Sequence, residues 1–66
     1  MKVDKDKLLI SMARACMDFT ELARKAQISR ATLYNASAGR DISPATLGVI
    51  SRALDIDPAE IIEKGE

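Results

Sequence analysis

The sequence predicts an all-α protein, and three observations support this prediction. The 66 residues are enough for one domain, so we expect residues 1–66 to form a single domain. The apolar 47% of the chain is mostly Ala, Ile, Leu and Met, while only two residues, Phe19 and Tyr34, are aromatic. No segment alternates apolar and polar residues as a half-buried strand does, and a helix-start signal recurs along the chain.

The helix-start signal occurs four times. Each copy is an apolar residue, then Asp or Ser, then three residues and a second apolar residue. In such a pattern the Asp or Ser accepts hydrogen bonds from free backbone N–H groups, and the apolar pair packs together as a hydrophobic staple. The four copies are Met17-Asp18…Leu22, Ile28-Ser29…Leu33, Ile42-Ser43…Leu47 and Ile56-Asp57…Ile61.

The first three predicted helices lie in the N-terminal part of the chain. Residues 5–15 are amphipathic and place Leu8, Met12 and Ala15 on one face. Residues 19–26 come after Asp18, and Glu21 completes a capping box with it. Residues 30–37 come after Ser29, and Gly39 is a typical left-handed stop for that helix.

The last two predicted helices, 44–54 and 58–63, each begin with proline. Pro44 and Pro58 occupy the first helical position, where the missing N–H costs nothing. Asp57 and Glu60 form a second capping box. The sequence therefore predicts five helices.

The second and third helices are separated only by Gln27-Ile28-Ser29. So short a turn makes two helices cross steeply, as in a helix-turn-helix unit. The small Ala23 lies where the two helices approach most closely. The inward-facing apolar residues are Leu22, Ala26, Ile28, Leu33 and Ala36. This arrangement leaves Arg30, Ala31, Tyr34 and Asn35 on the outer face of the third helix.

Residues 19–36 resemble the helix-turn-helix of the phage repressor and Cro family, often called the XRE family. The resemblance extends over about residues 5–62 and implies a five-helix lambda-repressor-like DNA-binding domain. It is carried by Met17-Asp18-Phe19-Thr20-Glu21-Leu22-Ala23, by Ile28-Ser29-Arg30-Ala31-Thr32-Leu33, and by Gly39-Arg40, Ser43-Pro44, Leu47, Ala53-Leu54, Ile56 and Ile61.

The resemblance implies that helix 30–37 enters the DNA major groove. Family members commonly face base edges with the residues found here as Arg30, Ala31 and Asn35, and Tyr34 lies on the same side. The chemistry agrees, because Arg can bind guanine and Asn can bind adenine through two hydrogen bonds, and an Ala methyl can contact thymine.

Phosphate contacts are implied at Ser29, Thr32 and Arg40, with Arg24 and Lys25 as further candidates. The formal net charge of the chain is zero, but its charges are uneven. Residues 22–40 contain four basic and no acidic residues, and residues 41–66 contain two basic and six acidic residues. A basic middle segment is typical of a surface that meets phosphates.

The chain departs from the family pattern at three places. Gln27 replaces the usual glycine of the turn, where a left-handed conformation favours glycine. Phe19 replaces a phosphate-binding glutamine, and we expect it in the core or an interface. Met12 and Ser37 occupy positions where some members have a buried Arg–Glu pair.

We expect a sequence-specific double-stranded DNA-binding transcription regulator, specifically a repressor, acting as a homodimer on a pseudo-palindromic operator. The expected dimer surface contains Ile56, Ile61 and Ile62. Two alternatives remain open. One is a protein-interaction module of the same fold without DNA binding, which the neutral charge favours. The other is an antitoxin or the controller of a restriction system.

Enzymatic function is not expected. The chain has no histidine, and its single cysteine, Cys16, lacks a basic partner nearby. Clusters of metal ligands are also missing, so we expect no metal, no cofactor and no small-molecule ligand. The sequence shows neither a secretory signal nor a bilayer-spanning segment, and we expect a cytoplasmic protein.

Overall fold

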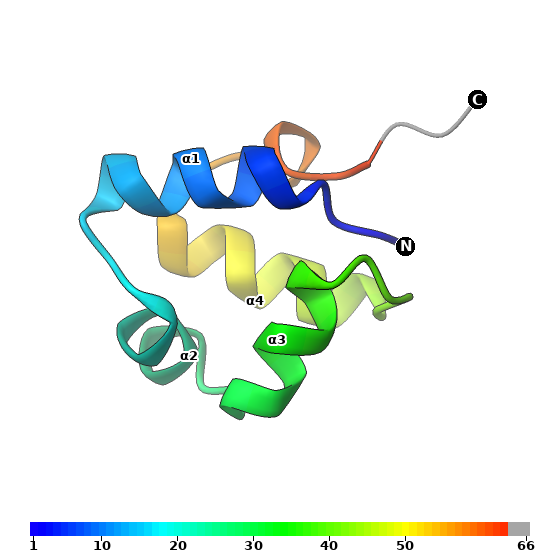
Figure 1. Ribbon diagram of the computed structural model, residues 1–66, viewed down its shortest axis with the longest axis horizontal. Coiled ribbons are helices and arrows are strands. Elements are labelled where there is room, and N and C mark those ends of the chain that lie inside the picture. The colour runs from blue at the N-terminus through cyan, green and yellow to red at the C-terminus, as the bar shows by residue number, and fades with distance from the viewer. Residues whose placement is uncertain (64–66) are drawn as a thin grey trace.

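Four α-helices and one short 3-10 helix make up the computed structural model, which describes residues 1–63 (Figure 1). The predicted all-α class is confirmed, and all four α-helices have the predicted bounds. They are α1 (Lys5–Ala15), α2 (Phe19–Ala26), α3 (Arg30–Ser37) and α4 (Pro44–Leu54), and the 3-10 helix η1 (Pro58–Glu60) comes after them.

The helices begin where they do because each start is capped by a side chain. Asp18 Oδ1 accepts from the Glu21 N–H at 2.8 Å, and both halves of that capping box are present. The Asp57–Glu60 capping box is present as well. Asp4, Ser29 and Ser43 cap α1, α3 and α4 in the same way. These local hydrogen bonds satisfy N–H groups that a helix cannot satisfy itself.

The predicted fifth helix, 58–63, is wrong in type and length. Only Pro58–Glu60 is helical, as a 3-10 turn, and the chain then runs along the N-terminal segment. Ile62 pairs with Val3 in an antiparallel β-bridge. The Asp4 N–H donates to the Ile61 carbonyl and the Glu63 N–H to the Lys2 carbonyl, both at 2.8 Å. This pairing satisfies the backbone while Val3 and Ile61 enter the core.

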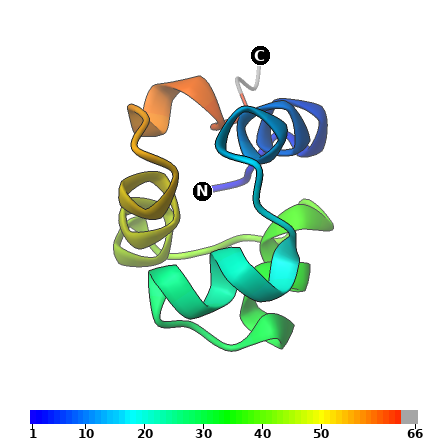
Figure 2. The same cartoon turned by 90° about the vertical axis from the view of Figure 1, so that its left-hand side faces the viewer.

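The core lies between two ends of the molecule. Figures 1 and 2 show α1 and η1 at one end and α2 with α3 at the other, with α4 between them. One cluster of buried side chains joins all these parts except η1 itself: Val3, Leu8, Met12, Leu22, Ala23, Ala26, Leu33, Ala36, Leu47, Ile50, Ala53, Leu54 and Ile61. The helix-turn-helix is therefore supported from behind by α4.

The turn between α2 and α3 has the left-handed conformation that usually favours glycine. Gln27 has φ 60° and ψ 41°, and its N–H closes the end of α2. The Ile28 N–H donates to the Ala23 carbonyl at 3.0 Å, and Ala23 is buried as expected. A glutamine in the left-handed conformation thus occupies the position of the usual glycine in this short turn.

Met12 and Ser37 are both buried. Neither side chain carries a charge, so these positions hold no ion pair. The Ser37 hydroxyl donates to the Tyr34 carbonyl at 2.9 Å, within its own helix. Its polar group is therefore satisfied without a charged partner. In the described residues no buried side-chain nitrogen or oxygen lacks a hydrogen-bond partner.

Candidate DNA-binding surface

The outer face of α3 is uncovered. Arg30, Ala31, Tyr34 and Asn35 are all exposed, whereas Leu33 and Ala36 on the inner face are fully buried. The inner pair fixes the rotation of the helix about its axis, because a slip would expose apolar surface. The four residues predicted to face DNA bases are thus brought together on one free face.

The start of α3 is electrostatically suited to an anion. Ser29 Oγ accepts from the Thr32 N–H at 3.0 Å and lies 2.9 Å from Thr32 Oγ1. The first turn contains no acidic residue, and Arg30 is its first residue. A helix N-terminus carries a partial positive charge, so this end attracts a phosphate group. The cap role predicted for Ser29 is confirmed.

An aromatic pair joins α2 to the outer face of α3. The rings of Phe19 and Tyr34 lie 4.8 Å apart between centroids and are tilted by 43°. Phe19 is half-buried and packs against the core, while Tyr34 remains 53% exposed. This pairing escaped the sequence analysis, although the two residues are the only aromatics of the chain. It restricts the Tyr34 ring at the predicted DNA face.

Arg40 lies just beyond α3 and is tied to it. Its N–H donates to the Asn35 carbonyl at 3.2 Å, and its side chain is exposed. Neither Arg40 nor Arg30 forms an ion pair within residues 1–63. Both guanidinium groups are therefore available to an external anion.

Asp41, the acidic neighbour of Arg40, forms an ion pair with the N-terminal ammonium group, which is far from it in the sequence. The Met1 ammonium donates to Asp41 Oδ1 at 2.7 Å. This hydrogen bond and the charge of the ammonium hold the pKa of Asp41 below its usual range. Sequence reasoning missed the pair because no local pattern connects these residues.

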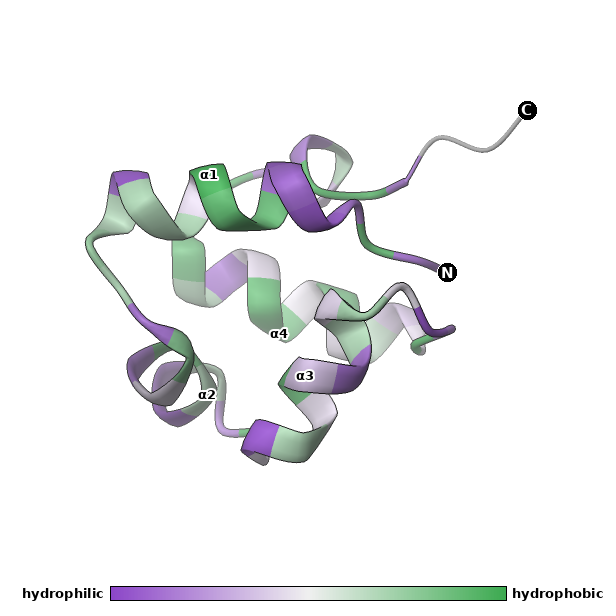
Figure 3. Ribbon diagram, viewed as in Figure 1, coloured by the Kyte–Doolittle hydropathy of each residue, from purple (hydrophilic) through white to green (hydrophobic). Residues whose placement is uncertain are grey.

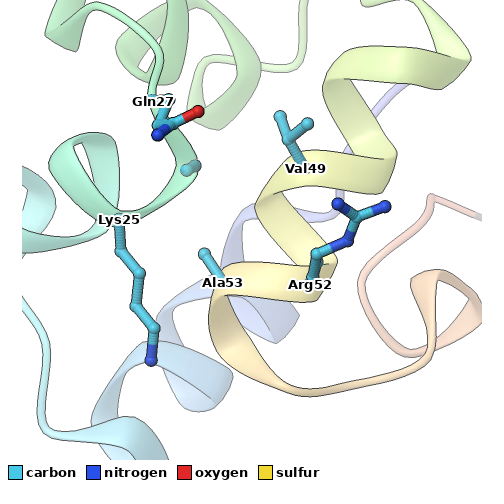
Figure 4. A pocket seen from close by; sticks show the side chains of 6 residues that line it. Lys25, Gln27, Val49, Arg52 and Ala53 are labelled. Atoms are coloured by element: carbon cyan, nitrogen blue, oxygen red, sulfur yellow. The ribbon is translucent and has the colours of Figure 1, made fainter.

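Arg24 and Lys25 line pockets beside α2. Lys25 lines a pocket of about 200 Å³ between α2 and α4, together with Gln27, Val49 and Arg52 (Figure 4). Arg24 and Lys25 also line a second pocket with Met17 and Glu21. Arg30 and Arg40 line neither of these pockets, although all four residues belong to one basic stretch of sequence, and the phosphate role of Arg24 and Lys25 stays a prediction.

The start of α4, which the sequence predicted, also lacks acidic residues in its first turn, and its likeness to the start of α3 was missed. Ser43 caps α4 through the Thr46 N–H at 3.1 Å, and Ser43 Oγ lies 3.0 Å from Thr46 Oγ1. The same geometry occurs at Ser29 and Thr32. The repeated Ser-x-Ala-Thr-Leu motif was the available signal.

The expected dimer surface needs a correction. Ile61 is 0% exposed within the single chain, because it fills the core beside the N-terminal segment. Ile56 and Ile62 are half-buried and pack against the same core. Ile61 is therefore not available to a second molecule in this conformation.

Residues 1–63 contain no metal-binding cluster and no membrane span. Within this part of the chain, no group of three or more His, Cys, Asp or Glu residues could hold a metal ion. No described helix combines the length and hydropathy needed to cross a bilayer.

Comparison with known protein families identifies the chain. The Cro/C1-type HTH DNA-binding domain matches residues 7–64, which is most of the sequence. The chain belongs to this family. Searches of curated proteins and of solved structures gave no significant match. This Cro/C1-type domain is a DNA-binding, regulatory fold whose partner is double-stranded DNA, and such domains are not typically enzymes.

Proposed function

We propose that this Cro/C1-type domain is a sequence-specific transcription repressor that places α3 in the major groove. The observation that carries the proposal is the free outer face of α3, where Arg30, Ala31, Tyr34 and Asn35 are all exposed. The buried Leu33 and Ala36 hold this face outward. A helix fits the major groove, where each base pair offers a distinct hydrogen-bond pattern.

In this proposal, Arg30 and Asn35 provide the specificity. Each can make two hydrogen bonds to one base, Arg to guanine and Asn to adenine, and Ala31 contacts a thymine methyl group. Tyr34, held by Phe19, lies against the edge of the same site. Ser29, Thr32 and Arg40 bind phosphates and set the register of the helix without distinguishing bases.

We further propose that two copies bind a pseudo-palindromic operator. Helix-turn-helix dimers place their recognition helices about 34–36 Å apart, one turn of DNA. Repression requires only that the bound dimer occupies a promoter, so the proposed binding is sufficient for it. In vitro transcription from a promoter that contains the selected site should fall as protein is added.

The test is loss of discrimination on substitution of the base-contacting residues. A binding site is first selected from a random DNA library, and affinities for that site and for a shuffled duplex are measured by fluorescence anisotropy. Arg30→Ala and Asn35→Ala should each reduce the free-energy difference between the two duplexes by about 1–3 kcal/mol. The selected preference should relax at guanine for the first variant and at adenine for the second.

Arg52→Ala is the matched control, since Arg52 is an exposed arginine on α4, beside the Lys25 pocket. It should leave discrimination unchanged. If Arg30→Ala and Asn35→Ala both bind with unaltered specificity, the assignment of base contacts is wrong. If the wild-type protein selects no site at low or moderate salt, the alternative of a protein-interaction module is favoured.

A further inference from the structure

We propose that Ala31 and Tyr34 of α3, with Phe19 of α2 behind them, recognise the C5-methyl group of a pyrimidine base in the major groove. We call these three residues the apolar patch. Within it, Ala31 and Tyr34 contact the methyl group, and Phe19 is a positioning residue that holds the Tyr34 ring. The inference deepens the proposed function, because it rests on α3 lying in the major groove and names a base feature that Arg30 and Asn35 do not read.

The apolar patch lies in the middle of a surface that is otherwise polar. Tyr34 is 53% exposed, and Ala31 is exposed as well. In the described part of the chain four large hydrophobic side chains are exposed, and Tyr34 is the one among them that belongs to the helix-turn-helix. Figure 3 shows two strongly hydrophilic segments on α3 with a paler stretch between them. Arg30 and Asn35 thus leave apolar surface between them on the face that is proposed to meet the bases.

Ala31 and Tyr34 are neighbours on the surface of α3. They are three residues apart in the sequence, which places their side chains next to each other on one side of a helix. Aromatic side chains in a helix lean toward its N-terminus, so the Tyr34 ring is directed over the turn that contains Arg30 and Ala31. At about 3.6 residues per turn, the directions of Ala31 and Tyr34 fall between those of Arg30 and Asn35. The Ala31 methyl and the Tyr34 ring therefore form one continuous surface.

Phe19 determines how Tyr34 presents its ring. The two ring centroids are 4.8 Å apart, and the ring planes are tilted by 43°. Phe19 is itself half-buried and packs against the core, so it gives the Tyr34 ring a fixed wall from a different helix. A side chain that is held in place before binding loses less conformational entropy when it meets its partner. Phe19 therefore acts on DNA recognition through Tyr34 and does not need to touch the bases.

The C5-methyl group is the partner that such a patch requires. Among the groups by which base pairs are distinguished in the major groove, the thymine methyl is the apolar one, and the others are hydrogen-bond donors and acceptors. An apolar side chain placed over a donor or acceptor removes its water without giving a hydrogen bond, which costs free energy. The apolar patch should therefore favour thymine at its position. A 5-methylcytosine carries the same methyl group on the same ring carbon, so the patch should also distinguish methylated from unmethylated cytosine.

The first experiment removes the methyl group from the DNA. In the site selected by the wild-type protein, each thymine is replaced in turn by deoxyuridine, which lacks only this group, and affinities are measured by fluorescence anisotropy. At one position of the site the replacement should weaken binding about threefold to fivefold. We call this factor the methyl ratio. A selected site without thymine, or one in which no replacement changes the affinity, would overturn the proposal.

Variants of Tyr34 assign the methyl ratio to its ring. Tyr34→Ala should reduce the ratio toward unity, whereas Tyr34→Phe, which keeps the ring and loses the hydroxyl, should retain it. Arg40→Ala is the matched control, because Arg40 is an exposed cation just beyond α3 that is proposed to bind a phosphate. It should weaken binding to both duplexes and leave the ratio unchanged. A full ratio in Tyr34→Ala, or loss of the ratio in Tyr34→Phe, would overturn the role of the ring.

Variants of Phe19 test its positioning role. Phe19→Ala should reduce the methyl ratio, and Phe19→Tyr, which keeps the ring, should retain it. The same protein sample binds both duplexes, so a loss of folded protein cancels in the ratio, and a merely structural role would not change it. If Phe19→Ala does not fold, Phe19→Val retains more of the buried volume and gives the same test.

A double-mutant cycle tests whether Phe19 acts through Tyr34. In the Tyr34→Ala background, Phe19→Ala should have no further effect on the methyl ratio, because the ring that it holds is already missing. An unchanged ratio in the single variant Phe19→Ala, or an equal further fall in the double variant, would overturn the coupling.

Cytosine methylation extends the test to a second base. The sensitive thymine–adenine pair is replaced by a cytosine–guanine pair, once unmethylated and once with 5-methylcytosine. The wild-type protein should bind the methylated duplex about threefold to fivefold more tightly, and Tyr34→Ala should bind the two duplexes alike. Equal binding of both duplexes by the wild-type protein would overturn recognition of the methyl group.

The base preferences assigned to Arg30 and Asn35 separate this inference from the proposed function. Tyr34→Ala should keep the selected guanine and adenine preferences, and Arg30→Ala should keep the methyl ratio. If those preferences depend on Arg30 and Asn35 but every thymine of the site can be replaced without effect, the inference alone is contradicted. A wild-type protein that selects no site contradicts the proposed function itself.

Discussion

At the scale of single residues, Gln27 adopts a backbone conformation that is strained for a residue with a Cβ atom. The residue is left-handed, with φ 60° and ψ 41°, and it begins the three-residue turn Gln27-Ile28-Ser29 that connects α2 to α3. A side chain with a Cβ costs about 1 kcal/mol or somewhat more in this conformation. The turn is held nevertheless, because the backbone of Ile28 donates a hydrogen bond to the carbonyl of the buried Ala23.

Gln27→Gly should therefore stabilise the fold. Glycine adopts the left-handed conformation without the Cβ penalty, so the free energy of unfolding should rise by about 1 kcal/mol. Urea unfolding measured by circular dichroism reports this change. Gln27→Ala, which keeps the Cβ, should give no such gain, and an equal gain in both variants would contradict the explanation.

Asp41 makes the stability depend on pH at the acidic end. Its folded-state pKa is lowered, first by the hydrogen bond from the Met1 ammonium and then by the charge of that group. A carboxyl whose pKa is depressed on folding stabilises the fold above its unfolded pKa, near 3.9, and this contribution is lost as the pH falls through the folded pKa. NMR titration should show Asp41 protonating at a lower pH than in a chain whose N-terminal amine is acetylated. An identical titration in both forms would exclude the ammonium as the cause.

At the scale of the elements, the start of α3 combines two roles in Ser29. The hydroxyl caps the helix, and the first turn, free of acidic residues, is open to a phosphate group. The two roles separate on substitution, because aspartate caps a helix as well as serine does but repels phosphate.

Ser29→Asp should thus keep the stability and lose DNA affinity. The free energy of unfolding should stay within about 0.5 kcal/mol of the wild-type value, whereas Ser29→Ala should lower it by about 1 kcal/mol. Affinity for DNA should fall more in the aspartate variant than in the alanine variant. Urea unfolding and fluorescence anisotropy on the same samples provide both values, and the reverse order of affinities would remove Ser29 from the phosphate contacts.

The sequence allowed prediction of those elements that are defined by local signals. Capping residues and staples determine the starts of α2, α3 and α4, and helical periodicity separates Leu33 and Ala36 from the outward residues of α3. The segment after η1 was mispredicted, because its capping box defines only one turn. The path of residues 61–63 is decided by pairing with residues 2–4, to which no local pattern points.

The candidate site shows the same division. Arg30, Ala31, Tyr34 and Asn35 lie on one face as periodicity predicted. Lys25 is near Arg30 along the chain, but it lines a pocket with Arg52 of α4. The order of charges in the sequence does not show which face of the molecule a helical residue occupies.

At the scale of the whole molecule, the two ends of the described chain complete the core. Ile61→Ala should lower the free energy of unfolding by about 2–5 kcal/mol, because it leaves a cavity among fully buried side chains. Ile10→Ala, at an exposed position, should change it by less than about 0.5 kcal/mol in dilute solution. Urea unfolding at low protein concentration provides both values, and similar losses in the two variants would contradict the assignment of Ile61 to the core.

The pairing of Val3 with Ile62 also has a consequence for biosynthesis. Both Val3 and Ile61 are buried, so the hydrophobic interior is unfinished until the last of these residues has left the ribosomal exit tunnel. The earlier helices emerge with their partners still inside the ribosome, and helices of eight to eleven residues are marginal in isolation. The nascent polypeptide therefore cannot complete its native core until the segment that contains Ile61 has emerged from the tunnel.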